Sequence, residues 1–447
     1  MNLPVVSISE VVSRHMCTGC GACAFMCPDK VQMIDTATHG RRPELVDGPA
    51  DPRDASLEQA ALVCPGVNYP AMPAPAAGVE PELFDEWGPV LEVWEGYSTD
   101  SEIRFRGSSG GVVTGLALFC VEQGGMAGAL HVRARQDAPL LNETVLSRDR
   151  ESLLAGSGSR YSPASPCEEL GQIENAEGPC VFIGKPCDIA AAAKARAVRP
   201  ELDRKLGLTI GIFCAGTPSL QGTIALAKRL GADDPSQIED IRYRGHGWPG
   251  EITATWRNPK TGLLRTSSVT YADGWGNTLQ KYRQWRCHMC ADHTGETADV
   301  SVGDPWYRPV QPGEPGRSLV LVRTERGRQI VREAVAKGYL VLERRAAHIL
   351  VDSQKHLERT RATIWGRSVA SRLLGVLTPQ YKGMKLFKAW AKRLSWKERL
   401  QSLTGTVTRV FRRHLLRPER SVPAQIGNFS RDSEDQAERP VACSAGG

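Results

Sequence analysis

The N-terminal part of this chain is organised around the stretch CTGCGACAFMCP, residues 17–28. Cys17, Cys20 and Cys23 recur at every third position, so one tight loop can point three thiolates at a common centre. The glycines between them let backbone amides turn towards the sulfur atoms and stabilise their negative charge. The spacing therefore predicts that these cysteines bind three irons of one [4Fe–4S] cluster.

The fourth thiolate of that cluster must come from elsewhere in the chain. In bacterial ferredoxins it belongs to a distant Cys-Pro pair, and Cys64-Pro65 is such a pair. Cys27 is the alternative: it is a fourth ligand in place of Cys64, a ligand of a remote cluster, or a plain buried thiol. A structural zinc site is disfavoured, because such sites use two separated cysteine pairs.

Four more cysteines occupy distinctive positions further along the chain. Cys187 and Cys214 each follow an apolar, strand-like segment, and Cys287 and Cys290 form a C-x-x-C pair. Taken singly, a strand-end cysteine is equally typical of a buried thiol, and the pair is equally typical of half a zinc site. Together they make a second set of four.

Composition favours a cytoplasmic protein with metal or redox chemistry. Thirteen cysteines without a signal peptide are typical of a reducing compartment rather than of a disulfide framework. The longest apolar run, residues 111–121, has 11 residues, against about 20 that cross a bilayer. The net charge of +6 says little about a nucleic-acid partner, and none is expected, because residues 381–420 alone carry 12 Lys and Arg against two Glu.

The chain is predicted to have five parts. They are a ferredoxin-like module (1–66), a Pro/Ala-rich linker (67–90), a cofactor-binding domain (91–350), a basic helical region (351–420) and a disordered tail (421–447).

Strand-like and helix-like segments alternate in the cofactor-binding domain, which predicts an α+β or α/β fold. Strands are expected at residues 91–97, 128–133, 180–183, 208–213, 251–256, 300–302 and 318–323, and helices at 111–122, 188–197, 220–230 and 326–336.

Two loops rich in glycine and serine are candidates for contact with a ligand. Residues 107–111, GSSGG, precede a predicted helix, and small residues there let backbone amides surround an anionic group. Residues 156–161, GSGSRY, form a second such loop, for which a surface turn is an equally good interpretation. Neither is a Rossmann fingerprint, because G-x-G-x-x-G between a strand and an acidic residue is absent.

Several ordered motifs resemble the family of the coenzyme F420 hydrogenase/dehydrogenase beta subunit, which includes the plant 7-hydroxymethyl chlorophyll a reductase. The resemblance extends from about residue 14 to about residue 345. The motifs are RGSSGGVVT (106–114), IGKPCDIA (183–190), FCAGTPS (213–219), RYRGHGWPG (242–250), RCHMC (286–290) and DVSVGD (299–304).

This resemblance implies a non-covalent FAD beside two [4Fe–4S] clusters. The second cluster would be held by Cys187, Cys214, Cys287 and Cys290. The implied FAD-binding residues are Gly107, Ser108, Ser109, Gly110, Gly111, Thr114, Ser159 and Lys185. Lys185 and His246 are the catalytic candidates. Lys185 either places positive charge near a reduced flavin or is a solvated neighbour of Cys187, and His246 stands where Asn or another small polar residue is expected.

The predicted function is that of an iron–sulfur flavoprotein oxidoreductase. Ferredoxin or another one-electron carrier would exchange electrons with the first cluster, and a deazaflavin coenzyme or an organic substrate would exchange hydride with the flavin. Two alternatives stay open. One is an electron-transfer subunit that serves other redox subunits and has no substrate of its own; the other is a cluster-bearing protein that is not an enzyme.

Residues 381–417 form a basic amphipathic stretch, in which Met384, Phe387, Trp390, Ala391 and Leu394 share one face at helical spacing. One interpretation is an interfacial helix on anionic lipid or a dock for an acidic ferredoxin. The other is a helix that packs on the α/β domain and leaves its basic face in water.

Overall fold

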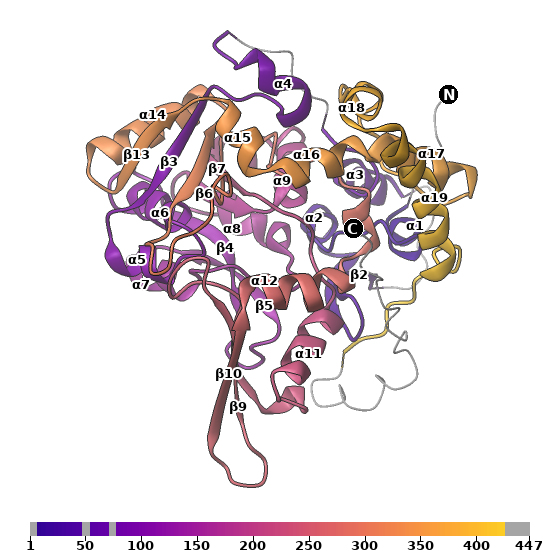
Figure 1. Ribbon diagram of the computed structural model, residues 1–447, viewed down its shortest axis with the longest axis horizontal. Helices are drawn as coiled ribbons and strands as arrows, with labels where there is room; N and C mark the ends of the chain where they lie inside the picture. The colour runs from indigo at the N-terminus through magenta and orange to yellow at the C-terminus, as the bar shows by residue number, and fades with distance from the viewer. Residues whose placement is uncertain (1–6, 47–53, 71–76, 425–447) are drawn as a thin grey trace.

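A computed structural model describes residues 7–46, 54–70 and 77–424 of the chain (Figure 1). Its centre is an eight-stranded sheet in the order β13-β3-β12-β11-β7-β6-β4-β5. The strands β11, β7, β6 and β4 run parallel, and both sides of the sheet add antiparallel strands, so the fold is mixed α/β. The strands are β3 (Glu92–Ser98), β4 (Gly128–Ala134), β5 (Asn142–Ser147), β6 (Cys180–Gly184), β7 (Leu206–Ile212), β11 (Val300–Gly303), β12 (Ser318–Val322) and β13 (Leu340–Arg345).

Helices cover both faces of this sheet, which explains why its central strands are continuous apolar runs. Neighbouring residues of β6 separate the two cores: Val181 packs with α6 and α14, and Phe182 packs with α9. The helices around the sheet are α5 (Ser101–Arg106), α6 (Val112–Glu122), α7 (Arg150–Ala155), α8 (Leu170–Glu174), α9 (Pro186–Arg196), α10 (Pro200–Lys205) and α14 (Glu325–Ala336).

The cysteine-rich N-terminal segment forms a small module on the α9 side. It contains α1 (Ile8–Ser13), α2 (Ala22–Met26), the antiparallel pair β1 (Val31–Thr36) and β2 (Gly40–Leu45), and α3 (Ala55–Val63). Phe25 of α2 and Val63 of α3 belong to the same apolar cluster as Ile189 of α9. The module is therefore packed firmly against the central domain.

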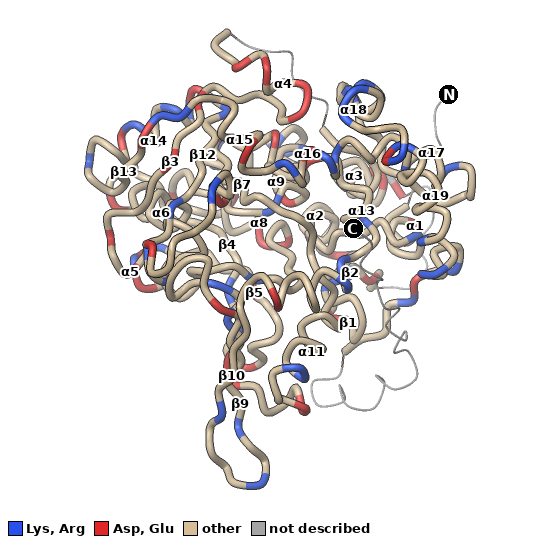
Figure 2. Tube along the Cα trace, in the orientation of Figure 1, with Lys and Arg blue, Asp and Glu red and all other residues tan. Residues whose placement is uncertain are grey.

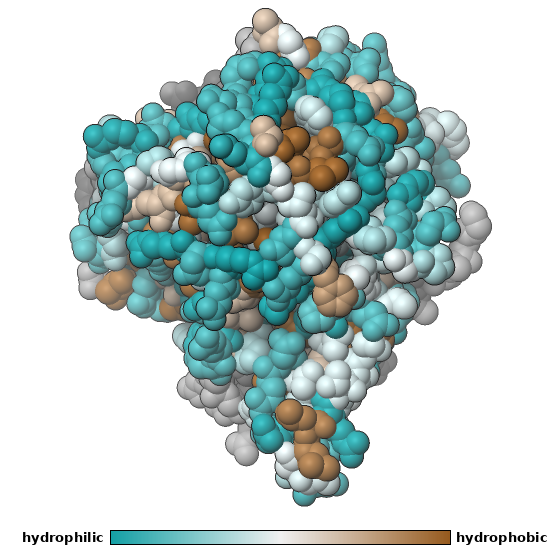
Figure 3. Space-filling view, turned by 90° about the vertical axis from the view of Figure 1, so that its left-hand side faces the viewer, coloured by the Kyte–Doolittle hydropathy of each residue, from teal (hydrophilic) through white to brown (hydrophobic). Residues whose placement is uncertain are grey.

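A second, three-stranded antiparallel sheet projects from the body of the molecule (Figure 1). It contains β8 (Ile238–Arg242), β9 (Glu251–Arg257) and β10 (Leu264–Thr270), and it packs on α11 (Leu220–Arg229). The hairpin between β9 and β10 ends in an apolar tip, where Leu263 and Leu264 are exposed (Figure 3). The short helices α12 (Tyr271–Asp273) and α13 (Trp285–His288) lead back to the sheet.

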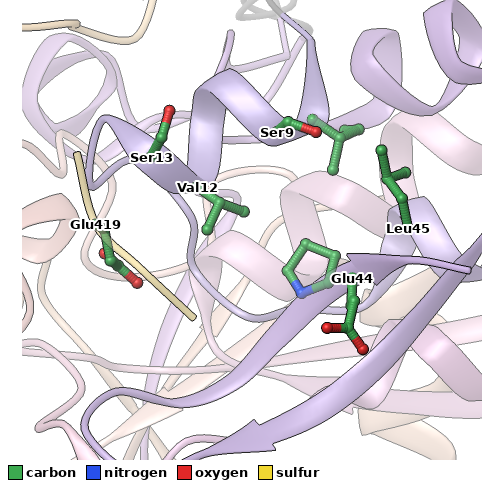
Figure 4. A pocket seen from close by; sticks show the side chains of 8 residues that line it. Ser9, Val12, Ser13, Glu44, Leu45 and Glu419 are labelled. Carbon is green, nitrogen blue, oxygen red and sulfur yellow. The ribbon is translucent and has the colours of Figure 1, made fainter. Parts of the chain in front are cut away.

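The C-terminal region is helical and lies against the N-terminal module (Figure 1). It contains α15 (His348–Ser353), α16 (Lys355–Ala362), α17 (Ile364–Leu373), α18 (Leu386–Arg393) and α19 (Trp396–Arg412). Beyond α19, Glu419 lines a cavity of about 150 Å³ with residues of α1 and β2, including Ser13 and Glu44 (Figure 4). In the part of the chain that the structure describes, no helix is long and apolar enough to span a bilayer.

Every strand and helix predicted for the cofactor-binding domain is confirmed to within two residues at each end. Strands β5, β8, β10 and β13 were not predicted. Their sequences mix apolar and polar residues or lie largely exposed, so they lack a continuous apolar run. The range predicted as a linker contains α4 (Pro81–Trp87), whose Leu83 and Trp87 pack against β3 and β12. From residue 425 on, the predicted tail lies outside the described residues.

The basic stretch 381–417 forms two helices rather than one. Ser395 starts α19 with a capping box, in which its side chain and that of Glu398 bond each other's backbone amides. The predicted apolar face is only partly buried: Leu394 is buried, but Phe387 is 57% exposed, while Leu386 and Ala389 fill the core instead.

Candidate functional site

Five strands of the central sheet, β3, β11, β7, β6 and β4, point in the same direction, so their carboxyl ends meet at one edge. The GSSGG loop follows β3 by way of α5, Cys187 follows β6, and Cys214 follows β7. Ligands of open α/β sheets commonly bind at this edge. The topology therefore gathers several of the predicted site residues at one end of the sheet.

The structure brings Cys17, Cys20 and Cys23 together with Cys64. Burial, opposed by Arg42 and reinforced by the Cys64 thiolate, raises the pKa of Cys17 to about 12. Burial and the thiolates of the other three cysteines raise the pKa of Cys23 well above its ordinary value. A cationic iron core would relieve this repulsion among buried thiolates, so the donor set fits an iron–sulfur cluster.

The loop that carries the first three cysteines depends on its glycines. Gly19 and Gly21 have φ angles of +72° and +86°, which favour glycine. The Gly19 N–H donates to the Cys17 sulfur at 3.3 Å, as the sequence predicts. A Cβ atom on Gly21 would lie 2.7 Å from the backbone nitrogen of Glu168, so this glycine also permits close packing.

Cys27 lies apart from this group by its contacts. Its thiol donates to the carbonyl oxygen of Ser56 at 2.8 Å, and its charged neighbours are Lys30 and Asp54 rather than another cysteine. Burial raises the pKa of Cys27. The structure thus favours Cys64 over Cys27 as the fourth ligand candidate of the first set.

The second set, Cys187, Cys214, Cys287 and Cys290, also meets in space. Burial and then the thiolate of Cys287 raise the pKa of Cys214 to about 12, and Cys214 in turn raises that of Cys187. Backbone and hydroxyl groups reach the sulfurs as well: the Thr217 N–H donates to Cys287 at 3.3 Å, and the Tyr69 hydroxyl lies 3.8 Å from the Cys290 sulfur. Four thiols from three separate segments therefore converge, as the resemblance implied.

Lys185 and Asp188 interact with both cysteine sets. The Lys185 ammonium is 2.7 and 2.8 Å from the two carboxylate oxygens of Asp188. Burial opposes the charge of Lys185, but Asp188, then Cys187, and also Cys20 raise its pKa. Because Cys20 and Cys187 belong to different sets, this one cation interacts with both.

Sequence reasoning missed two residues of this region, Asp188 and Cys167. A hydrogen bond with Cys167 lowers the pKa of Cys20 to about 7, although burial and Asp188 oppose the shift. The adjacent Cys187-Asp188 pair at a helix start could have pointed to Asp188. No sequence signal singles out Cys167.

Arginines surround the second set on the side of the C-terminal helices. Arg283 donates to the carbonyl oxygen of Ala215 at 2.9 Å, and Arg367 donates to that of His288 at 2.7 Å. Among the described residues, neither arginine forms an ion pair with a carboxylate. The Nε atom of Arg283 and the Nε2 atom of His288 are buried and have no hydrogen-bond partner in the ranges that the structure describes. Uncompensated positive charge here favours an anionic centre, such as a thiolate-bound cluster.

Neither set fits a single metal ion. Within the described ranges, no three His, Cys, Asp or Glu side chains are arranged to hold one ion. A zinc ion binds thiolate sulfurs at about 2.3 Å and so requires them to be nearly in contact. A cubane instead spreads its four thiolates over four corners.

The two glycine loops contact each other, which the sequence did not indicate. The Ser108 hydroxyl accepts a hydrogen bond from the Ser159 N–H at 2.7 Å and lies 2.8 Å from the Ser159 hydroxyl. Ser109 is tied to the sheet through the Ser318 hydroxyl at 2.8 Å. The Ser157 hydroxyl is buried and has no hydrogen-bond partner in the described part of the chain, which leaves a polar atom for a ligand group.

The glycines of the GSSGG loop are first of all required by the chain itself. A Cβ atom on Gly110 would lie 2.5 Å from the Gly96 carbonyl oxygen, and Gly111, with φ +72°, starts α6. The backbone amides at the start of this 11-residue helix, with Thr114 half-buried in its first turn, fit an anionic ligand. The loop is thus compatible with FAD, with the unpartnered Ser157 hydroxyl as the independent indication.

The two catalytic candidates lie in different surroundings. Lys185 belongs with the cysteines, and none of its described contacts is with a glycine loop. His246 is exposed, has a φ of +57° and stacks on Phe105, whose ring centre is 5.1 Å away. The Gly247 N–H donates to the Phe105 carbonyl oxygen, so the loop of His246 adjoins the GSSGG loop.

An aromatic wall stands behind this loop. Trp248 stacks on Trp306, with ring centres 5.5 Å apart. Tyr271 also stacks on Trp306, with ring centres 6.4 Å apart. Asp304 holds the wall together, because it accepts two hydrogen bonds from the buried Arg244 and one from Trp248, each of 2.8 Å. Asp304 is therefore a structural residue.

Comparison with known proteins places this site in a family. Residues 93–170 match the N-terminal part, and residues 179–347 the C-terminal part, of the family described as "Coenzyme F420 hydrogenase/dehydrogenase, beta subunit". Together these ranges cover more than half of the chain and contain both glycine loops and the second cysteine set.

Relatives from methanogens agree with this assignment. "Coenzyme F420 hydrogenase subunit beta" of Methanosarcina barkeri is 26% identical over 259 residues, which cover 54% of this chain and 77% of the relative. A subunit of the F(420)H(2) dehydrogenase of Methanosarcina mazei is 26% identical over 326 residues, 72% of this chain and 82% of the relative. "Coenzyme F420-dependent sulfite reductase" of Methanocaldococcus jannaschii is 24% identical over 356 residues, 75% of this chain and 48% of the relative.

The motifs from which the resemblance was inferred lie inside these matched ranges, and the match confirms it. The chain belongs to the family of the coenzyme F420 hydrogenase/dehydrogenase beta subunit, a family of oxidoreductases.

Proposed function

We propose that this chain is an iron–sulfur flavoprotein that transfers electrons between a one-electron carrier and a hydride partner. Cys17, Cys20, Cys23 and Cys64 would bind one [4Fe–4S] cluster, and Cys187, Cys214, Cys287 and Cys290 would bind a second. FAD would bind at the two glycine loops. When bound, the clusters supply one-electron steps and the flavin supplies a two-electron step.

The observation that carries the proposal is the contiguity of these parts. Cys20 and Cys187, one from each cysteine set, both interact with the buried Lys185. The second set in turn shares one edge of the sheet with the GSSGG loop. This supports an electron path that enters at the first set, crosses the second and ends at the flavin, or the reverse.

Residues around the sets would stabilise the negative charge that each added electron brings. Lys185 contributes a fixed positive charge that interacts with both sets, and Asp188 orients its ammonium through two hydrogen bonds. Arg283 and Arg367 contribute further positive charge beside the second set, where they bond the carbonyl oxygens of Ala215 and His288. Low solvent access strengthens these interactions, since charge is screened less in a buried site.

Coenzyme F420 is the hydride partner that we propose first, because the relatives named above are described by that coenzyme. An organic substrate is the alternative. His246 is the residue that we propose to contact the hydride partner, because it is exposed beside the GSSGG loop. Ferredoxin or a similar protein would be the one-electron carrier at the first set.

A second candidate function is an electron-transfer subunit without a substrate of its own. It is favoured by the relatives from Methanosarcina barkeri and Methanosarcina mazei, both of which are described as subunits. Turnover of a small substrate by the isolated chain would support an enzyme; electron transfer only in the presence of a further subunit would support this alternative.

The first experiment is anaerobic purification followed by iron, sulfide and flavin quantitation and EPR of the reduced protein. We expect about eight irons and one FAD per chain, with signals from two interacting clusters. About four irons and no flavin would contradict the proposal.

A single variant tests the order of the path. Cys20→Ser should abolish flavin reduction by reduced ferredoxin while direct reduction of the flavin by dithionite persists. Cys27→Ser is the matched control and should behave as the unmodified protein. Ferredoxin-driven reduction that survives in Cys20→Ser would mean that the carrier docks elsewhere.

A further inference from the structure

Helix α19 turns polar residues towards the protein and apolar residues towards solvent, which is the reverse of an ordinary surface helix. Its inward face carries Ser402 and Thr406, which are 4% and 0% exposed. Its outward face carries Trp396, Leu400 and Phe411, which are 75%, 52% and 56% exposed. A helix that packs on a core normally buries its apolar stripe and leaves its polar face in water.

The exposed apolar residues of α19 form one continuous line. Trp396, Leu400, Val407 and Phe411 are separated by four, seven and four positions, which places them on the same side of a helix. Val407 is also exposed, so the line is not interrupted in the middle. The stripe extends along nearly all of the 17-residue helix.

Contacts on the inward face fix the rotation of α19 about its own axis, and this rotation leaves the apolar side exposed. The indole N–H of Trp390 donates to the Ser402 hydroxyl at 3.0 Å. Val410 is fully buried in the cluster that also contains Met16 and Cys17. Rotating α19 to bury its stripe would break both contacts.

Two exposed cations of α19 adjoin the ends of this stripe in the sequence: Lys397 follows Trp396, and Arg412 follows Phe411. Neither forms an ion pair with a carboxylate among the described residues. Lys385 and Lys388 of the same region are instead neutralised by Asp85 of α4. Figure 2 shows the Lys and Arg residues of α18 and of the end of α19 at the outer margin of the molecule.

We propose that the exposed face of α19 docks on an anionic lipid bilayer, with the helix lying in the plane of the headgroups. An exposed line of Trp, Leu and Phe beside free Lys and Arg is the pattern of an interfacial helix. The aromatic and aliphatic side chains enter the headgroup boundary, and the cations meet lipid phosphates. A protein partner fits less well, because protein interfaces are depleted in lysine.

Docking in this way gives the molecule a defined orientation. Val410, on the inward face of α19, packs in one cluster with Met16 and Cys17, so the first cysteine set would lie behind the docked helix. This surface lies beyond residue 347, where the family match ends, and is therefore separate from the site that the family shares.

The test uses the full chain and vesicle flotation. One set of vesicles is phosphatidylcholine alone, and the other contains about one-third phosphatidylglycerol. We expect binding to the anionic vesicles only, weakened at high salt, with a blue shift of tryptophan fluorescence. Equal binding to both kinds of vesicle, or binding to neither, would overturn the proposal.

Matched variants locate the surface. Trp396→Ser, Leu400→Ser and Phe411→Ser combined should lower vesicle binding at least tenfold, and the fold is expected to survive because all three side chains are exposed. Leu263→Ser with Leu264→Ser, at the equally exposed hairpin tip, is the control and should bind as the unmodified chain.

Two results of this comparison would overturn the proposal. One is vesicle binding that is unchanged in the α19 triple variant. The other is a concentration-dependent dimer that the triple variant abolishes while no vesicles are bound, which would identify a second copy of the chain as the occupant. Neither readout depends on iron, flavin or turnover, so both are independent of the proposed function.

Discussion

Replacing Cys64 with Ser is expected to remove one complete cluster from the protein, whereas the same change at Cys27 is expected to leave the metal content intact. The two residues are a matched pair, since each is a cysteine of the N-terminal module and each packs in the same apolar cluster. They differ in what their sulfur atoms face: Cys64 raises the pKa of Cys17 and Cys23, and Cys27 bonds Ser56.

The magnitudes follow from these contacts. In Cys64→Ser, the hydroxyl is a poor iron ligand, so the iron content should fall from about eight to about four per chain. In Cys27→Ser, the new hydroxyl can still donate to the Ser56 carbonyl, and the residue is 5% exposed. Burying a hydroxyl in place of a thiol should then lower the free energy of unfolding by roughly 1 kcal/mol.

The assay is iron and sulfide quantitation of anaerobically reconstituted protein, with EPR to identify which cluster signal is lost and denaturant unfolding to measure stability. A Cys27→Ser protein that retains about four irons, beside a Cys64→Ser protein that retains about eight, would refute the assignment of the fourth ligand. Full metal content in both variants would refute the cluster at this site altogether.

Three further predictions concern stability and flavin binding. Lys185→Met leaves the buried Asp188 carboxylate without its cation and should lower the free energy of unfolding by roughly 3–5 kcal/mol. Combining it with Asp188→Asn should restore most of this loss. Additive losses of the two variants in denaturant unfolding would argue against an interacting pair. Ser108→Ala removes both hydrogen bonds to Ser159 and should weaken FAD binding about tenfold at unchanged iron content, measured by fluorescence of released flavin. Glu419 is 9% exposed, and although burial raises its pKa, Arg42 and two histidines lower it to about 2. Its pKa is below the unfolded value, so its contribution of about 3 kcal/mol to the free energy of unfolding is present above pH 4.5 and should be lost as the pH falls towards 2. In Glu419→Gln, the free energy of unfolding should depend less on pH in this range. An unchanged pH dependence would contradict the assignment.

Local sequence was sufficient for those features whose geometry is local. Three cysteines at every third position with glycines between them fix a loop that needs no distant partner to form. The apolar runs of β6, β7 and β12 likewise specified buried strands, because a strand covered on both faces has no polar side to alternate with. The family motifs belong to the same class of information, since each is a short contiguous segment.

Tertiary structure alone decided which distant residues meet. Cys27 is adjacent in sequence to the first set, yet α2 ends at Met26 and the Cys27 thiol bonds the Ser56 carbonyl. Cys64, at the end of α3, is instead the fourth cysteine that meets the other three. Lys185, predicted either beside the flavin or as a neighbour of Cys187, interacts with both cysteine sets because α9 packs against the N-terminal module. The outward face of α19 was equally hidden, because periodicity shows that a helix has an apolar side but not whether protein or solvent lies against it.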